Sequence, residues 1–184
     1  LLIKLSGKTL RLHSYKDYGI AIGLGIIMSI HWITYFAAMQ FSTVAIGMIA
    51  LFTFPIITVL LEPFFEPFKL VWQDLVSGVT VLVGIILIVP EANLENDVTW
   101  GIFIGVISAI FYALRNLLHR KYFAHYSGPH AMAMQTLVVA ISLIFFISDE
   151  LFSATPYDYL LLIILGTLCT AAPHALIATS FIYI

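Results

Sequence analysis

The sequence predicts an all-α membrane protein, a bundle of six transmembrane helices, from three observations. Of the 184 residues, 61% are hydrophobic and only 10% are charged, whereas soluble domains carry about 25% charged residues. The apolar residues fall into runs near the length of about 20 residues with which a helix crosses a bilayer. Short polar or proline-containing breaks separate these runs. We therefore expect a lipid bilayer, rather than water, to surround most of the chain.

The net charge, the cysteine content and the two ends of the sequence further restrict the class of membrane protein. The net charge of −2 argues against a nucleic-acid partner, and the single cysteine excludes an internal disulfide. The sequence does not begin with the pattern of a signal peptide. Because Leu1 and Ile184 both lie in apolar runs, we expect the chain to be an internal part of a longer membrane protein.

Two apolar runs on either side of Gln40–Thr43 predict a helical hairpin that crosses the bilayer twice. Its spans are expected at residues 18–39 and 43–61, with Ser42 or Thr43 capping the second helix. Four further spans are expected at 71–90, 100–118, 130–148 and 159–182. A polar loop, residues 4–17, precedes the first span, and further loops at residues 62–70, 91–99, 122–129 and 149–158 separate later spans.

Lysine and arginine residues predict the orientation of these spans. All eight lie on one side under this assignment, in residues 4–16, at Lys69 and in residues 115–121. Since cytoplasmic loops carry an excess of Lys and Arg, residues 1–17 are expected in the cytoplasm. Arg115 lies one turn inside the fourth span and is expected to extend its side chain toward that face.

An internal repeat is visible at an offset of 141 residues. Lys16–Gly25 aligns with Tyr157–Gly166, and Asp, Tyr, Ile, Leu and Gly recur in register. Because five spans separate the two starts, the copies enter the membrane from opposite faces, as in the inverted-topology repeats of many secondary transporters. The alternative is a coincidence among apolar residues.

Polar residues near the middle of spans are candidate functional residues. His31 and His174 lie near the centres of the first and sixth spans, where an ionisable side chain is costly unless it serves a function. The alternative is a neutral histidine hydrogen-bonded across helices. Trp32 and Tyr35 lie beside His31, and aromatic side chains near a cavity suit organic, partly apolar substrates.

Prolines inside two spans predict helix kinks. Pro55 and Pro173 each remove a backbone hydrogen bond. Each kink either lines a water-filled path or is a structural feature in which Thr53 or Thr170 satisfies the freed carbonyl group.

The fourth span carries two stripes of residues at helical spacing. The first contains only small residues, which let helices pack closely: Gly101, Gly105, Ala109 and Ala113. The second is polar: Ser108, Tyr112 and Arg115, with Asn116 adjacent.

Soluble-enzyme signatures are absent from the sequence. It contains no Gly-rich phosphate loop, nucleophile elbow or HExxH pattern, so neither an enzymatic activity nor a cofactor is predicted. His125 and His130 lie in a loop without metal-ligand spacing, and no metal site is predicted.

Several segments together resemble the drug/metabolite transporter superfamily, specifically its EamA-type group. They are His31-Trp32-x-x-Tyr35-Phe36-Ala37, Ser42–Ala45, Pro55, Glu62-Pro63, Gly78 through Gly84 to Pro90, Trp100-Gly101, Ser108-Ala109, Tyr112-Ala113 and Arg120-Lys121. The resemblance implies an inverted five-plus-five-helix repeat. Residues 1–92 would be the end of the first EamA-type repeat and residues 99–184 the start of the second, each with three transmembrane helices.

The resemblance also implies a function and a site. The function is that of a secondary transporter, an exporter of small metabolites, amino-acid-like compounds or drugs across the bacterial inner (plasma) membrane by alternating access. The family's central cavity draws on its third, fourth, sixth and eighth helices. On the matching spans of this chain we predict as substrate-binding residues His31, Trp32, Tyr35, Thr53, Tyr112, Asn116 and His174, with helix kinks at Pro55 and Pro173. A membrane-embedded interaction or scaffold subunit without transport is the alternative. A coupling proton and a homo-oligomer are left open.

Overall fold

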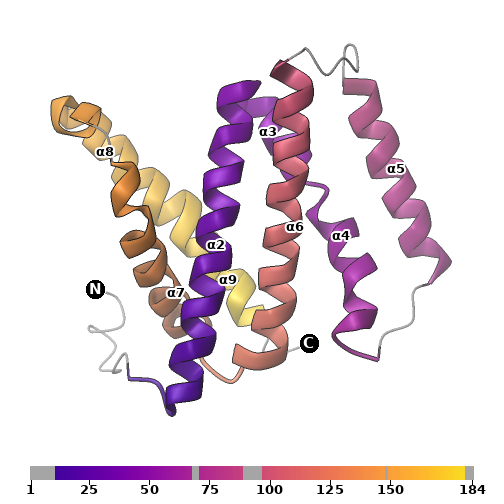
Figure 1. Ribbon diagram of the computed structural model, residues 1–184, viewed down its shortest axis with the longest axis horizontal. Coiled ribbons are helices and arrows are strands. Elements are labelled where there is room, and N and C mark those ends of the chain that lie inside the picture. Colours follow the sequence, from indigo (N-terminus) through magenta and orange to yellow (C-terminus); the bar gives the residue numbers. More distant parts are fainter. Residues whose placement is uncertain (1–10, 68–70, 89–96, 148, 181–184) are drawn as a thin grey trace. The chain divides into compact units, whose positions relative to one another are not determined.

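The computed structural model describes residues 11–67, 71–88, 97–147 and 149–180, which form helices and turns without any strand (Figure 1). The α-helices are α2 (Tyr15–Phe41), α3 (Val44–Leu51), α4 (Phe54–Leu61), α5 (Trp72–Ile88), α6 (Asp97–Phe123), α7 (Gly128–Leu143), α8 (Pro156–Ile164) and α9 (Ala172–Ser180). Short 3₁₀ turns lie at Glu62–Phe64, Ile144–Phe146 and Asp149–Ser153, and a π-helical segment, Leu165–Ala171, joins α8 to α9. The predicted all-helical fold class is confirmed.

Five stretches of the described chain are long and apolar enough to cross a bilayer, which identifies an integral membrane protein. They are Tyr15–Phe41, Val44–Phe64, Asp97–Phe123, Gly128–Phe146 and Pro156–Ser180. They coincide with five of the six predicted spans. Helix α5 lies where the third span was predicted, and its 17 residues are at the lower limit of about 17 that a span requires. This sixth crossing stays a prediction.

The second span is divided into two helices. Thr43 is the N-cap of α3, since its side chain accepts a hydrogen bond from the Ile46 amide at 3.2 Å. Helix α3 ends at Leu51, and α4 begins at Phe54 with Pro55 in its first turn. Proline fits this position because the first amides of a helix have no partner within the helix. The Thr53 hydroxyl, at the break, donates to the Ala50 carbonyl at 2.7 Å.

The last span contains a different irregularity. Within Leu165–Ala171 the helix widens to π geometry, and the Ala172 amide donates to the Thr167 carbonyl five residues earlier. Pro173 follows directly, as the second residue of α9. Such π-bulges inside helices occur frequently at functional sites.

The chain forms two compact units, residues 27–118 and residues 1–26 with 119–184. Helices α2 and α6 contribute to both. The predicted repeat boundary, between residues 92 and 99, falls largely outside the described residues and stays a prediction.

In the unit of residues 27–118, small side chains bring α6 against α2 and α3. A Cβ atom added at Gly101 would lie 2.9 Å from the Ala38 carbonyl oxygen, and one at Gly105 would lie 2.5 Å from the Cβ of Ala50. Ala38, Ala50, Ala109 and Ala113 are at most 1% exposed. The small stripe of the fourth span therefore packs as predicted. Without a hydrophobic driving force between helices in lipid, such close contact is what holds them together.

In the other unit, α2 and the α8–α9 helix run in opposite directions. At the start of α2, Asp17 accepts a hydrogen bond from the hydroxyl of Tyr126, which lies just before α7. Further along both helices, Gly25 of α2 lies against Val138 of α7. The start of α7 contacts the end of α9, where Gly128 packs against Ala175 and Thr179. Helix α7 is thus parallel to α2 and antiparallel to α9.

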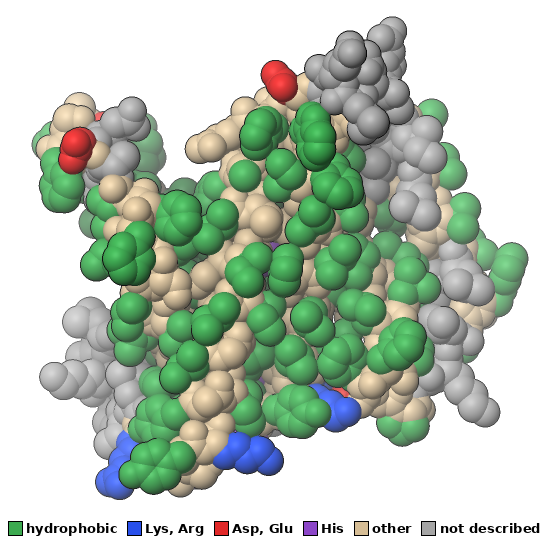
Figure 2. Space-filling view, in the orientation of Figure 1, with side chains coloured by type: hydrophobic (Ala, Val, Ile, Leu, Met, Phe, Trp, Pro, Cys, Tyr) green, Lys and Arg blue, Asp and Glu red, His purple; other side chains and the backbone are tan. Residues whose placement is uncertain are grey.

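Apolar side chains dominate the surface in Figure 2, where hydrophobic groups cover most of the visible face and the lysines and arginines in view lie at its edge. Leu160 to Leu165 along α8 are all at least 39% exposed. In water such a surface would be an aggregation site. In a membrane protein it is the surface that meets lipid or another helix.

We predict that Gly105→Leu destabilises the protein, because the new side chain would overlap Ala50. Overpacking typically costs about 1–3 kcal/mol. Gly23→Leu is the matched control, since nothing lies within 4 Å of a Cβ atom at Gly23. Thermal unfolding in detergent should show a lower midpoint for Gly105→Leu only. Equal midpoints for the two variants would contradict the packing described for α6.

Candidate functional site

A buried hydrogen-bonded pair, His31 and Ser108, joins α2 to α6. His31 is 3% exposed and Ser108 is 0% exposed. The Ser108 hydroxyl donates to the His31 carbonyl at 2.9 Å. The His31 Nδ1 atom lies 2.8 Å from the Ser108 hydroxyl and 3.1 Å from the Ser108 carbonyl oxygen. The two residues therefore satisfy each other's polar groups near the middle of two predicted spans.

This geometry specifies the tautomer of the His31 ring. A carbonyl oxygen only accepts hydrogen bonds, and the single hydroxyl proton of Ser108 is directed at the His31 carbonyl. The proton between Nδ1 and Ser108 must therefore belong to Nδ1. In the neutral ring Nε2 then carries the lone pair, and it is the nitrogen that can accept a proton.

Aromatic rings enclose the His31 imidazole. Tyr112 stacks on it with centroids 4.8 Å apart, and Tyr35 lies parallel at 6.0 Å. Phe54, the first residue of α4, meets Tyr112 edge-on at 4.8 Å. Residues from α2, α4 and α6 thus form an aromatic wall beside the imidazole, and aromatic pairs in these arrangements attract one another.

The polar contacts continue along α6 to a buried arginine. Tyr112 hydrogen-bonds to Asn116, and Arg115 Nη1 donates to Asn116 Oδ1 at 2.9 Å. Arg115 is 0% exposed, so the expectation that it extends to the membrane face is wrong. Its position seven residues after Ser108 places it on the same face of the helix, the buried face. We call His31, Ser108, Tyr112, Arg115 and Asn116 the polar cluster.

Three other predicted site residues of this unit, Thr53, Pro55 and Trp32, differ in their burial and their contacts. Thr53 is 3% exposed at the break between α3 and α4, next to Phe54. Pro55 is exposed. Trp32 is half-buried and meets Phe36, one turn along its own helix, edge-on at 5.9 Å. Tyr35 is the neighbour whose ring stacks on His31 from the same helix.

His174 belongs to the other compact unit. It is half-buried on α9, and its Nδ1 atom lies 2.8 Å from the Thr170 carbonyl oxygen of the preceding turn. Thr170 is thus a partner at this irregular segment, through its backbone. The neighbouring Pro173 is exposed. A cavity shared by His31 and His174 would join the two units and stays a prediction.

Three further features were not assigned to the site from the sequence. Ser108 and Arg115 were visible as part of a polar stripe, but only their burial shows that they belong with His31. Phe54 gave no signal, because an aromatic residue in an apolar run is unremarkable. In the other unit, Gln135 Nε2 on α7 lies 3.3 Å from His119 Nδ1, and both residues are fully buried.

A hollow of about 500 Å³ lies along α8. Its lining consists of Asp158, Leu161, Leu162, Ile164, Leu165 and Cys169. None of the predicted substrate residues is among them. Comparison with models of protein families, with curated proteins and with solved structures found no match to this chain.

We predict that Ser108→Ala destabilises the protein, because the buried hydrogen bonds of the Ser108 hydroxyl to His31 are lost. The His31 carbonyl keeps the Thr34 hydroxyl as a donor at 3.0 Å, so the expected cost is that of one typical hydrogen bond, about 0.5–1.5 kcal/mol. Ser77→Ala on α5 is the control, since Ser77 is exposed and its hydroxyl donates to the Gln73 carbonyl of its own helix. Denaturant titration in detergent should separate the two variants. Equal stabilities would show that the buried pair does not hold α2 to α6.

Proposed function

We propose that this chain is part of a secondary transporter for small organic compounds. The observation that carries the proposal is the polar cluster within two apolar spans. A buried histidine and a buried arginine at this depth are expensive for a membrane protein, and such residues typically mark substrate or ion pathways. A scaffold helix would reach the same packing with fewer ionisable groups.

The repeat supports the same proposal. Ser14 and Asp17 form a capping box at the start of α2, with Ser14 N to Asp17 Oδ2 at 3.1 Å and Asp17 N to Ser14 Oγ at 3.2 Å. Thr155 and Asp158 form the same box at the start of α8, at 2.9 and 3.3 Å. The boxes are 141 residues apart, the offset of the sequence repeat, and the helices that follow are antiparallel. Inverted repeats of this kind underlie alternating access in many transporters.

Interrupted helices support it as well. The break at Phe52–Thr53 and the π segment Leu165–Ala171 each fall inside a span. Discontinuous helices build the substrate sites of many transporters, since their freed backbone groups are tolerated where they line a cavity or are buried in protein. In the EamA-type arrangement that the sequence resembles, the two interruptions belong to helices of opposite repeats.

The chemistry of the cluster suggests the class of substrate. Arg115 supplies a positive charge, His31 a titratable nitrogen, and Tyr35 and Phe54 an apolar wall. This combination fits a compound with a carboxylate and an apolar body, and amino-acid-like metabolites are such compounds. Drugs of similar shape fit the same description, and a proton carried by His31 is a candidate coupling ion.

The orientation and location belong to the proposal too. Apart from the buried Arg115, the basic residues of the described chain flank the start of α2 and the end of α6. They are Arg11, Lys16, Arg120 and Lys121. By the positive-inside rule this end faces the cytoplasm, so we place residues 1–17 there. The resemblance to EamA-type transporters suggests that the membrane is a bacterial inner membrane. We expect no enzymatic activity.

A scaffold or interaction subunit is the second candidate. The observation in its favour is that His31, Ser108, Tyr112 and Asn116 are hydrogen-bonded or stacked on one another, which is all that helix packing requires. The lining of the hollow along α8 also includes none of these residues. The two candidates differ in whether the cluster binds a compound from outside the protein.

We predict that His31→Gln and Arg115→Gln impair transport by the full-length protein. The assay is uptake of labelled amino acids, other carboxylates and cationic drugs into proteoliposomes. Loss of one hydrogen bond or charge from the site should weaken apparent affinity about tenfold or more, equivalent to ~1.4 kcal/mol. Ser77→Ala is the matched control and should transport normally.

Thermal unfolding of each variant distinguishes loss of binding from loss of fold. The proposal fails if the folded wild-type protein transports none of the panel, or if folded His31→Gln and Arg115→Gln proteins both transport like the control. Transport of a carboxylate that is lost only in Arg115→Gln would confirm the role of the arginine and leave His31 as a packing residue.

A further inference from the structure

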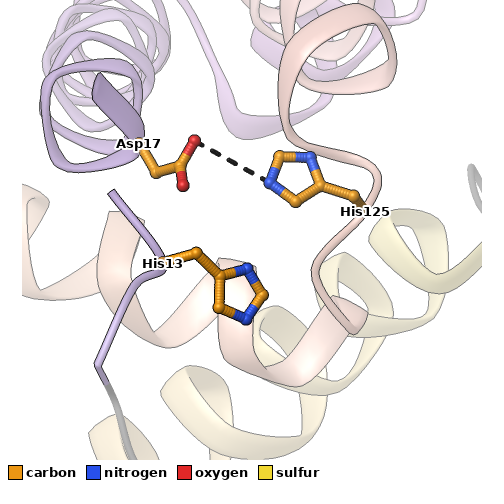
Figure 3. A group of neighbouring side chains, drawn as sticks. All are labelled: His13, Asp17 and His125. Carbon is orange, nitrogen blue, oxygen red and sulfur yellow. Dashed lines mark ion pairs between the residues drawn. The ribbon is translucent and has the colours of Figure 1, made fainter. Parts of the chain in front are cut away.

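A cluster of metal-ligating side chains lies at the basic end of the unit that contains α7 to α9. His13 precedes α2, Asp17 is in the first turn of α2, and His125 is in the turn between α6 and α7 (Figure 3). Each offers one ligand atom, and these atoms all lie within 4.8 Å of one another. His13 and Asp17 are close in sequence, but His125 lies more than 100 residues further along the chain, so no spacing pattern reveals the group.

We propose that His13, Asp17 and His125 bind a divalent transition-metal ion, with zinc as the first candidate. Two imidazoles and one carboxylate are a common zinc ligand set, and three protein ligands leave a fourth position for water. At zinc-ligand bonds of about 2.0–2.1 Å, tetrahedral ligands lie roughly 3.3–3.4 Å apart. Both histidines are exposed, so their rings can rotate by the small distance that closing the set requires.

The carboxylate of Asp17 is held in position for this role. Its Oδ2 atom accepts from the Tyr126 hydroxyl at 2.8 Å and from the Ser14 amide at 3.1 Å. Its Oδ1 atom faces His125 Nε2 at 3.8 Å. That separation is longer than a hydrogen bond but close to that of two ligands sharing one ion. Carboxylates that bind metals are in turn hydrogen-bonded by outer groups that fix their orientation, and Tyr126 and Ser14 supply those bonds.

Tyr126 connects the three ligand residues. Its hydroxyl also accepts a hydrogen bond from the His13 amide at 2.7 Å, and its ring stacks on His13 at 4.9 Å and tilts against His125 at 4.4 Å. The same hydroxyl donates to Asp17 Oδ2 at 2.8 Å. The arrangement is therefore preorganised before any ion binds.

A bound ion would tie the segment before α2 to the α6–α7 turn. In the absence of metal this link consists of the Tyr126 hydrogen bonds and ring contacts described above. The metal site is independent of the proposed transport activity, because none of its residues belongs to the polar cluster.

Zinc titration of the full-length protein in nanodiscs tests the proposal, by calorimetry and by the visible spectrum of Co²⁺ as a substitute. One ion per chain is expected. His13→Gln and His125→Gln should each weaken binding about tenfold or more, as loss of even an outer-shell partner commonly weakens metal affinity 10–100-fold. Because both side chains are exposed, these variants should fold normally.

Asp17→Asn and Asp158→Asn form a matched pair, since both alter the capping box of a helix start but only Asp17 lies beside histidines. Zinc should bind Asp158→Asn like the wild type and should bind Asp17→Asn weakly. Zinc should also raise the unfolding temperature of the wild type and of Asp158→Asn, but not of Asp17→Asn, because a ligand stabilises only the state it binds. No binding to the wild type, or equal binding to all variants, would overturn the proposal.

Discussion

The reciprocal hydrogen bonds between His31 and Ser108 are the interaction on which the rest of the site depends. A polar group inside an apolar span must find a partner within the protein, because the hydrocarbon offers none. Here one hydroxyl and one imidazole bridge α2 and α6, with Nδ1 committed to Ser108. The ring is thereby fixed so that Tyr35 and Tyr112 stack beside it. Close approach of the two helices is a precondition, and Gly101 and Gly105 on α6 provide it.

The two matching helix starts reveal a second constraint. A capping box satisfies amides that a helix end leaves without partners, and the boxes at Ser14–Asp17 and Thr155–Asp158 start helices that run in opposite directions. Their surroundings differ, since Asp17 lies beside His13, His125 and Tyr126, while Asp158 lines an apolar hollow. The same local element thus lies among histidine and tyrosine side chains at one helix start and beside apolar side chains at the other.

Much of the helical organisation could be predicted from the sequence, because long apolar runs indicate membrane spans. Five spans, the cap at Thr43 and the small-residue packing of α6 followed from run length, capping chemistry and spacing. The burial of Arg115 could not be predicted, because its position near the end of a span suggested an exposed side chain. The face of the helix on which Arg115 lies, and not its distance from the span end, determines its burial. The contacts of Phe54 and the His13–Asp17–His125 cluster could not be predicted from the sequence either, since they depend on which helix ends and faces meet in three dimensions.

Accessibility of the polar cluster from the two sides of the membrane tests the account most directly. A cysteine replaces Tyr35, which contacts His31 and is half-buried, in a full-length protein whose native cysteines, Cys169 among them, are changed to serine. A membrane-impermeant thiol reagent is then added to either side of oriented vesicles. Alternating access predicts labelling from both sides, slowed by a transported compound. A cysteine that neither side reaches, or that one side alone labels whether or not a compound is present, would contradict a substrate site at this cluster.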